Sequence, residues 1–335
     1  KILSARTWNN NGITNHTAGR LRVEASSTLN NAVGGTFNVS TGNSAAITTF
    51  SGTGTFNNAG TLNWDTTVAA TIDPGNFNNT GLVNVNANNL TLNGAGTDTG
   101  TYDVDATRTL MFSSGTRTLA AGSNLTGTGS VTVSGATLNV NGTLGSNFAA
   151  VSVTGGSLNV GAGATLNGPL NLSGGTTTLS GLTSVGTLTM SGGVLTGTGN
   201  LTVAGAFDWS GGTISGASQL TTQSTSTLST TADKTLSGRT WNIQADTTFS
   251  AGRFRVEGSA TVNNPSGATF TVSTGSTAAI TTFSGTGTFN NAGTLNWDTT
   301  VAATIDPGNF TNTGLVNVNA NNLTLNGAGT DTGTY

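Results

Sequence analysis

Residues 45–102 read AAITTFSGTGTFNNAGTLNWDTTVAATIDPGNFNNTGLVNVNANNLTLNGAGTDTGTY, and the same string returns at residues 278–335. Of its 58 positions only one differs, Asn78 against Thr311. Whatever structure this stretch specifies, the chain therefore builds it twice, and near-identity at this length indicates a recent internal duplication.

The repeat is longer than this stretch. The match extends backwards, more loosely, to Lys1 and Lys234, at a constant offset of 233 residues without a gap. Residues 1–233 thus form one full repeat unit, and residues 234–335 begin the next. We expect the chain to be an uncapped window of a longer tandem array that forms one continuous solenoid.

Within the repeat, apolar residues alternate with small polar ones. Thr61-Leu62-Asn63-Trp64 and Leu82-Val83-Asn84-Val85 place apolar side chains at i and i+2, which is the period of a half-buried strand. Gly, Asn and Ser separate such segments, as turns require. No ten-residue stretch has helical spacing, so an all-β fold is predicted.

Many short strands fit either an antiparallel sandwich or a stacked solenoid. Sandwich domains have distinct cores of about 100 residues, whereas here G-x-[LVF]-x-[VLW] cassettes recur every 12 to 25 residues. This finer period favours a parallel β-helix of roughly 16 turns, at roughly 20 residues per turn. We take it to be right-handed, the commoner form, although the sequence does not show handedness.

Exchanges between the two copies agree with the alternation. Inward positions stay apolar, as in Leu21/Phe254 and Leu29/Val262. Positions that we assign to the outside or to turns exchange small and polar residues, namely Asn38/Thr271, Gly35/Ala268 and Asn43/Ser276.

The composition excludes several classes of protein. Hydrophobic residues make up 34% and charged residues 7%, with 50 glycines and a net charge of -3. Low charge with regular apolar spacing argues against disorder. Ten scattered cations argue against nucleic acid as a partner. No cysteine is available for disulfides or thiolate metal sites, and no apolar run is long enough for a transmembrane helix.

One segment could carry carbohydrate chemistry. Asp103 and Asp105 lie two residues apart on one strand face, with Arg108 beyond. The spacing implies about 7 Å between the carboxyl groups, near that of an inverting glycosidase pair. A solvated strand face with a loose ion pair explains the segment equally well. A carbohydrate-binding or carbohydrate-cleaving β-helix is therefore the alternative function.

Other chemistry-bearing residues favour structural roles. His16 is the single histidine, and Phe249 replaces it in the second copy, which argues against a catalytic base or metal ligand. The Trp-Asp pairs at Trp64 and Trp297 resemble sugar-binding aromatics, but a tryptophan filling the inside of a turn is the simpler interpretation. Thr176-Thr177-Thr178 suggests an ice- or mineral-binding ladder, against which the irregular cassette spacing argues.

One charged row repeats with the unit. We expect Arg20, Arg22 and Glu24 to alternate outward, and Arg253, Arg255 and Glu257 repeat them. Such a row is usually a solubilising face, or else a contact to a neighbouring chain. We predict no cofactor, because the glycine-rich strings lack the lysine of a phosphate loop and no calcium-binding nonapeptide occurs.

Four cassettes carry a family resemblance: LSGRTW (236–241), FNNAGTLN (56–63), NTGLVNV (79–85) and WSGGTISG (209–216). In these the chain resembles the giant tandem-repeat β-solenoid proteins of bacterial surfaces, akin to filamentous-haemagglutinin and autotransporter-type adhesins. The resemblance transfers no functional residue. It implies a non-enzymatic structural or adhesive fibre outside the cell or on its surface. The expected partners are neighbouring repeat units, laterally associated copies and surface glycans.

Overall fold

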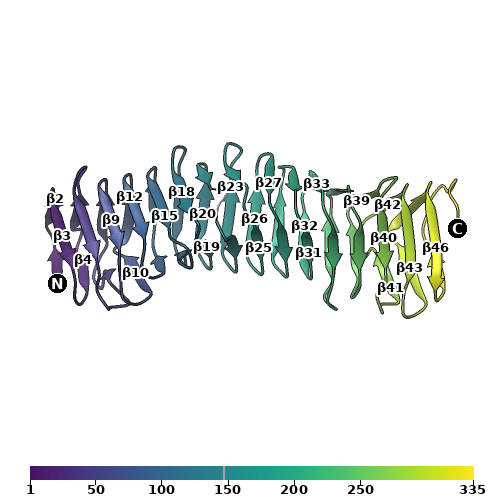
Figure 1. Cartoon of the computed structure of the whole chain (residues 1–335), viewed down its shortest axis with the longest axis horizontal. Coiled ribbons are helices and arrows are strands. Elements are labelled where there is room, and N and C mark those ends of the chain that lie inside the picture. The colour runs from purple at the N-terminus through teal and green to yellow at the C-terminus, as the bar shows by residue number, and fades with distance from the viewer. Residues whose placement is uncertain (146–147) are drawn as a thin grey trace. The chain divides into compact units, whose positions relative to one another are not determined.

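The structure of the protein is a computed structural model that describes residues 1–145 and 148–335. All regular elements of these residues are β-strands. They form two compact units, residues 1–168 and residues 169–335. In Figure 1 the strands of the first unit, coloured purple to teal, lie side by side as successive turns of one coil.

The first unit contains three columns of strands, one per face of the coil. The first column is β1 (Ile2–Ser4), β4 (Leu21–Glu24), β7 (Ile47–Thr48), β10 (Ala70–Asp73), β13 (Leu90–Leu92), β16 (Thr109–Phe112), β19 (Ser130–Val133) and β22 (Ala150–Val153). The second is β2 (Thr7–Asn10), β5 (Thr28–Asn31), β8 (Gly54–Asn58) and β11 (Gly75–Asn79), followed by a separate sheet of β14 (Gly96–Asp98), β17 (Thr116–Leu119), β20 (Thr137–Val140) and β23 (Ser157–Val160). The third is β3 (Ile13–His16), β6 (Thr36–Val39), β9 (Thr61–Trp64), β12 (Leu82–Val85), β15 (Thr101–Val104), β18 (Asn124–Gly127), β21 (Thr143–Leu144) and β24 (Thr165–Leu166).

The second unit repeats this plan. Its first column is β25 (Leu170–Leu172), β28 (Leu188–Met190), β31 (Phe207–Trp209), β34 (Ser226–Leu228), β37 (Thr247–Phe249), β40 (Thr269–Val272), β43 (Thr294–Asp298) and β46 (Leu315–Ala320). The second is β26 (Thr176–Leu179), β29 (Val194–Gly197), β32 (Gly212–Ser215), β35 (Lys234–Ser237), β38 (Phe254–Glu257), β41 (Ala278–Thr281), β44 (Ala303–Asp306) and β47 (Leu323–Leu325). The third is β27 (Thr183–Val185), β30 (Leu201–Val203), β33 (Gln219–Thr222), β36 (Thr240–Ile243), β39 (Thr261–Asn264), β42 (Gly287–Asn291) and β45 (Gly308–Asn312).

Every described strand pair is parallel, and each strand pairs with the equivalent strand of the next turn. For example, β9 pairs with β12 so that Leu62 lies beside Val83 and Trp64 beside Val85. Parallel strands one turn apart are the defining feature of a β-solenoid. The predicted parallel β-helix is therefore confirmed, with about 15 turns against the roughly 16 expected. Handedness and continuation into further units remain predictions.

The inside of each coil contains the apolar set that the alternation predicts. The exchanged pairs Leu21/Phe254 and Leu29/Val262 are all buried. Aromatic rings also contact one another from turn to turn: the centroids of Phe56 and Phe77 are 5.2 Å apart, with the ring planes tilted by 55°. Gly35 and Ala268, which we assigned to the outside or to turns, lie in the turn between two strands, and both are buried there.

A ladder of buried asparagines runs through the first unit along β2, β5, β8 and β11. Asn10 donates from Nδ2 to Oδ1 of Asn31 at 2.7 Å, Asn31 to Asn58 at 2.7 Å, and Asn58 to Asn79 at 2.8 Å. The same amides also donate to backbone oxygens of the following turn, as Asn31 does to Thr61 at 3.0 Å. Each buried amide is thereby satisfied, as a low-dielectric interior requires.

The residue before each of these asparagines forms a second, outward ladder. Asn30 donates to Oδ1 of Asn9 at 2.8 Å, Asn57 to Asn30 at 3.0 Å, and Asn78 to Asn57 at 3.0 Å. In the second unit, Asn263 and Asn290 continue the same pattern. Thr311, the single exchanged position of the duplicated stretch, replaces the amide that Asn78 contributes.

Glycines form a column at one corner of the first unit. A Cβ at Gly81 would lie 2.2 Å from the carbonyl oxygen of Gly60, and a Cβ at Gly100 would lie 2.2 Å from that of Gly81. Both contacts are far shorter than van der Waals distance, and both involve backbone that cannot move aside. The corner therefore requires glycine at these two positions.

Candidate interaction site

The repeated arginine row lies at the start of β4 in the first unit and of β38 in the second. In the first unit, Arg22 is half-buried and donates from Nε to Oε1 of Glu24 at 2.6 Å. The two side chains form an ion pair along a single strand. The structure thus brings the predicted charged residues together on one edge of the coil.

Glu24 does not point into solvent, contrary to our expectation. It is buried, and its Oε1 accepts a hydrogen bond from the backbone nitrogen of Phe50 at 3.0 Å. Glu257 is buried in the second copy as well. The glutamate therefore anchors the loop of the next turn. Its carboxylate supplies the hydrogen-bond acceptor that this loop N–H would otherwise lack.

The anchored loop presents an exposed phenylalanine that the sequence analysis missed. The side chain of Phe50 is 61% exposed. The guanidinium carbons of Arg20 and Arg22 lie 4.8 and 4.6 Å from its ring centroid, within the range of cation–π attraction. We call Phe50 with Arg20 and Arg22 the arginine–phenylalanine cluster. A break in the alternation at Thr48-Thr49-Phe50 was the only sequence signal for it.

The second copy builds the same cluster from Phe283, Arg253 and Arg255. Phe283 is 57% exposed, and the two guanidinium carbons lie 5.1 and 4.6 Å from its ring centroid. Arg255 pairs with Glu257, as Arg22 pairs with Glu24. Every other phenylalanine of the chain is buried, so both exposures are specific to this cluster.

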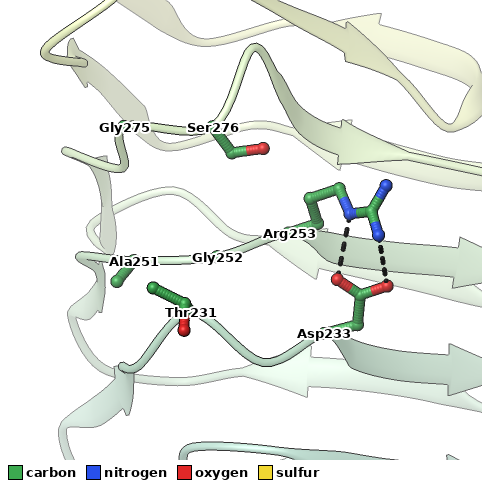
Figure 2. Close-up of a pocket in the computed structure, with 7 residues that line it drawn as sticks. All are labelled: Thr231, Asp233, Ala251, Gly252, Arg253, Gly275 and Ser276. Atoms are coloured by element: carbon green, nitrogen blue, oxygen red, sulfur yellow. Dashed lines mark hydrogen bonds and ion pairs between the residues drawn. The ribbon is translucent and has the colours of Figure 1, made fainter.

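An aspartate of the preceding turn completes the second cluster. Arg253 donates from Nε and Nη2 to the two carboxylate oxygens of Asp233 at 2.9 Å each. Figure 2 shows this two-point pair beside a shallow cavity of about 340 Å³. Three loops line the cavity, which also contains the hydroxyls of Thr231 and Ser276. Planar, bidentate pairing fixes the guanidinium in one orientation.

A buried ion pair lies inside the first unit, on β14 and β17. Arg117 donates from Nη1 to Oδ2 of Asp98 at 2.8 Å and to the carbonyl of Phe77 at 2.9 Å, and both charged side chains are almost wholly buried. Asp98 also accepts the backbone N–H of Asn79 at 2.8 Å. Burial raises the pKa of the neighbouring Tyr102. The pair thus follows directly after the last buried asparagine of the ladder.

Two cations are buried in the second unit, and neither forms an ion pair with a carboxylate. Lys234 donates to the carbonyls of Thr230 and Ala251 at 2.6 and 2.7 Å, and burial lowers its pKa to about 8. Arg239 donates to backbone carbonyls of the two preceding turns, including Ser215 at 3.0 Å, and burial lowers its pKa to about 10. Both residues bind the backbone of neighbouring turns.

The three residues of the predicted carbohydrate site are not joined by hydrogen bonds or ion pairs. Asp103 lies on β15 and accepts a hydrogen bond from Thr126 at 3.1 Å, whereas Asp105 is exposed in the loop that follows this strand. Arg108 donates to the backbone oxygen of Asn86 at 3.4 Å, and neither aspartate is its ion-pair partner. The pattern fits the solvated-strand interpretation better than the catalytic one.

The aromatic candidates occupy interior positions. His16 is buried with Nε2 at 3.2 Å from the carbonyl oxygen of Ala46, and burial lowers its pKa. Its counterpart Phe249 is also buried. Trp64 and Trp297 are fully buried, so their indoles fill turns as the simpler interpretation predicted.

The remaining candidates give no ligand site. Thr177 is buried, and Thr176 faces Val194 on the next turn, so the threonines do not form a continuous outward ladder. Among residues 1–145 and 148–335 no group of three His, Cys, Asp or Glu side chains could hold a metal ion. The described residues contain no helix that is long and apolar enough to cross a membrane.

Comparison with known proteins gives no relative: the chain matches no protein-family model, no curated protein and no solved structure.

Proposed function

We propose that this chain is part of a non-enzymatic structural or adhesive fibre, built from tandem β-solenoid units and displayed outside a bacterial cell. The observation that carries the proposal is the duplicated stretch of residues 45–102 and 278–335, which folds into equivalent solenoid turns in both units. What the two copies preserve is packing: buried apolar residues, the asparagine ladders and the glycine corners.

The chemistry of the surface supports the same proposal. Outward side chains are mainly Thr, Ser and Asn, and the carboxylates that could do acid–base work are either dispersed or engaged in ion pairs. Solenoid turns bury an apolar core only by stacking, so each further unit extends a stable rod. The low density of charge means that little electrostatic repulsion opposes the stacking of further units into a long filament.

The proposal is tested in the organism that makes the chain. Antibodies raised against residues 45–102 would label intact cells, examined by immunogold electron microscopy before and after mild protease treatment. We expect label on filaments outside the cell, and its loss after protease. A matched serum against a cytoplasmic protein of the same cells serves as control.

Sequencing the full gene provides a second readout. We expect further 233-residue units on at least one side of this window, and a secretion signal or anchor. Label confined to the cytoplasm of opened cells, or a globular catalytic domain directly adjoining this window without further units, would contradict the proposal.

A further inference from the structure

We propose that the arginine–phenylalanine cluster is a lateral contact to a second copy of this chain. The inference rests on the proposed fibre and names the partner of one of its surfaces. The cluster occurs twice, around Phe50 in the first unit and around Phe283 in the second, once per repeat.

The exposed ring is held rigidly, which distinguishes it from an incidental surface residue. In the first unit the loop carrying Phe50 is fixed by Glu24 at the Phe50 nitrogen and by Thr49, whose Oγ1 donates to Gly52 at 2.9 Å. Strand-to-loop bonds add to this, since Ala25 donates to the carbonyl of Ser51 at 3.0 Å. A preorganised aromatic flanked by arginines loses little entropy on binding and is typical of interface hot spots.

The charges of the complete cluster are self-complementary. In the second unit Arg253 and Arg255 surround the ring, while Asp233 and Glu257 lie beside them. The second cluster therefore has two positive and two negative groups around an apolar centre, and the first has two arginines with Glu24. A two-fold contact places the same patch on both partners, and a patch that carries charges of both signs is able to pair with itself. An anionic or a cationic ligand would find half of these charges repulsive.

The repetition of the cluster supports a second copy as the partner. Both copies of the stretch present an exposed phenylalanine flanked by two arginines, so every chain carries this patch twice and can offer it to another chain. Four of the chain's ten lysines and arginines lie in the two clusters, so positive charge is concentrated there.

The first test is self-association of the complete 335-residue chain by sedimentation velocity, from micromolar to near-millimolar protein. We expect concentration-dependent dimers. Phe50→Ser or Phe283→Ser alone should weaken the dimer about tenfold, and the double variant at least a hundredfold. The matched control is Leu182→Ser, because Leu182 is 75% exposed but lies outside the clusters. Its dimer should equal that of the wild type.

The absence of native cysteine permits a second, geometric test. Ser51→Cys and Ser284→Cys each place one thiol beside an exposed ring, and Ala162→Cys places one on the surface outside the clusters. Under mild oxidation we expect rapid disulfide-linked dimers from the first two variants and only slow ones from the third. Circular dichroism of every variant confirms that it retains its β-structure.

Three results would overturn the inference: a monomer over the whole range, dimers unchanged in the double phenylalanine variant, or equal cross-linking at Ala162. A chain that stays monomeric and binds a neutral or acidic glycan on a glycan array through its clusters would also overturn the inference. The partner of the cluster would then be a glycan and not a second copy of the chain. These outcomes leave the fibre proposal standing, since surface labelling of cells does not depend on dimerisation. Label confined to the cytoplasm together with normal dimerisation would instead contradict the fibre proposal and leave the lateral contact standing.

Discussion

Asn264 shows how one exchange propagates along a column of stacked residues. In the first unit, Oδ1 of Asn31 accepts from Asn10, but Ile243 stands where the second copy would have that donor. Oδ1 of Asn264 is consequently buried without a partner. The two equivalent asparagines therefore have the same packing and different numbers of hydrogen bonds.

This difference predicts unequal costs of substitution. Asn31→Ala should destabilise the protein by roughly 1–3 kcal/mol, because it leaves a buried donor on Asn10 and a buried acceptor on Asn58. Asn264→Ala should cost clearly less, since it removes an unsatisfied oxygen together with the amide. Urea unfolding of both variants measures the difference, and equal costs would show that the ladder bonds contribute nothing.

The buried Lys234 predicts a pH dependence of stability. Burial lowers its pKa from 10.5 to about 8 in the folded protein. Between these values the unfolded chain holds the proton while the folded chain releases it. Stability should therefore rise as the pH increases from about 8 to about 10.5. Below pH 8 the lysine is charged in both states, so its contribution no longer changes.

The matched variant is Lys234→Met, which keeps the length of the side chain but cannot titrate. The difference in unfolding free energy between wild type and variant, measured by urea unfolding at several pH values, isolates this group from the tyrosines. A difference that stays constant from pH 7 to 10.5 would contradict the assigned pKa.

At the scale of the strand, the two-residue period extends beyond the apolar core. Lys234 precedes Leu236 by two residues, Arg117 precedes Leu119, and each cation is buried in phase with its leucine. The alternation was thus the sequence signal for these buried cations, but we did not apply it to them because charged side chains are rarely found inside proteins. Buried asparagines follow an inward apolar residue in the same way, as Asn58 follows Phe56 and Asn31 follows Leu29.

Corners and loops were not predictable in this manner. Burial of Ala268, and the outward ring of Phe50, depend on which way the chain bends between strands, where no period applies. The inward turn of Glu24 needs a partner 26 residues away, the nitrogen of Phe50, which one strand's sequence does not reveal. The arginine row was therefore found from the sequence, whereas the ring at its centre required the structure.

The glycine corners give a prediction for the elements they join. Gly81→Ala should destabilise the first unit by about 2 kcal/mol or more, because the new Cβ would lie 2.2 Å from the Gly60 carbonyl oxygen. Gly163→Ala is the control, since its Cβ would meet no atom within 4 Å. Thermal unfolding followed by circular dichroism compares the two variants. Equal melting temperatures would mean that the corner relaxes without cost.

At the scale of the whole molecule, cohesion comes from packing and neutral hydrogen bonds rather than from surface charge. Charged residues make up 7% of the chain, and the described residues form few ion pairs. The Asp98–Arg117 pair is shielded by burial. Salt screens exposed charges but leaves buried pairs and van der Waals contacts almost unaffected.

We therefore expect the unfolding free energy to change by less than about 1 kcal/mol between low salt and 1 M sodium chloride. Urea unfolding at the two ionic strengths measures this. A large loss of stability at high salt would show that exposed ion pairs stabilise the fold, against the packing described above.

The paired asparagine ladders have an electrical consequence for a molecule that grows by adding turns. Along β2, β5, β8 and β11 the buried amides donate towards the later turn, whereas their outward neighbours donate towards the earlier turn. The two rows of amide dipoles therefore oppose each other. An α-helix concentrates partial charge at its ends because its peptide dipoles align. Here the two rows oppose each other, so the ladders along these four strands contribute little net dipole to the axis of the coil.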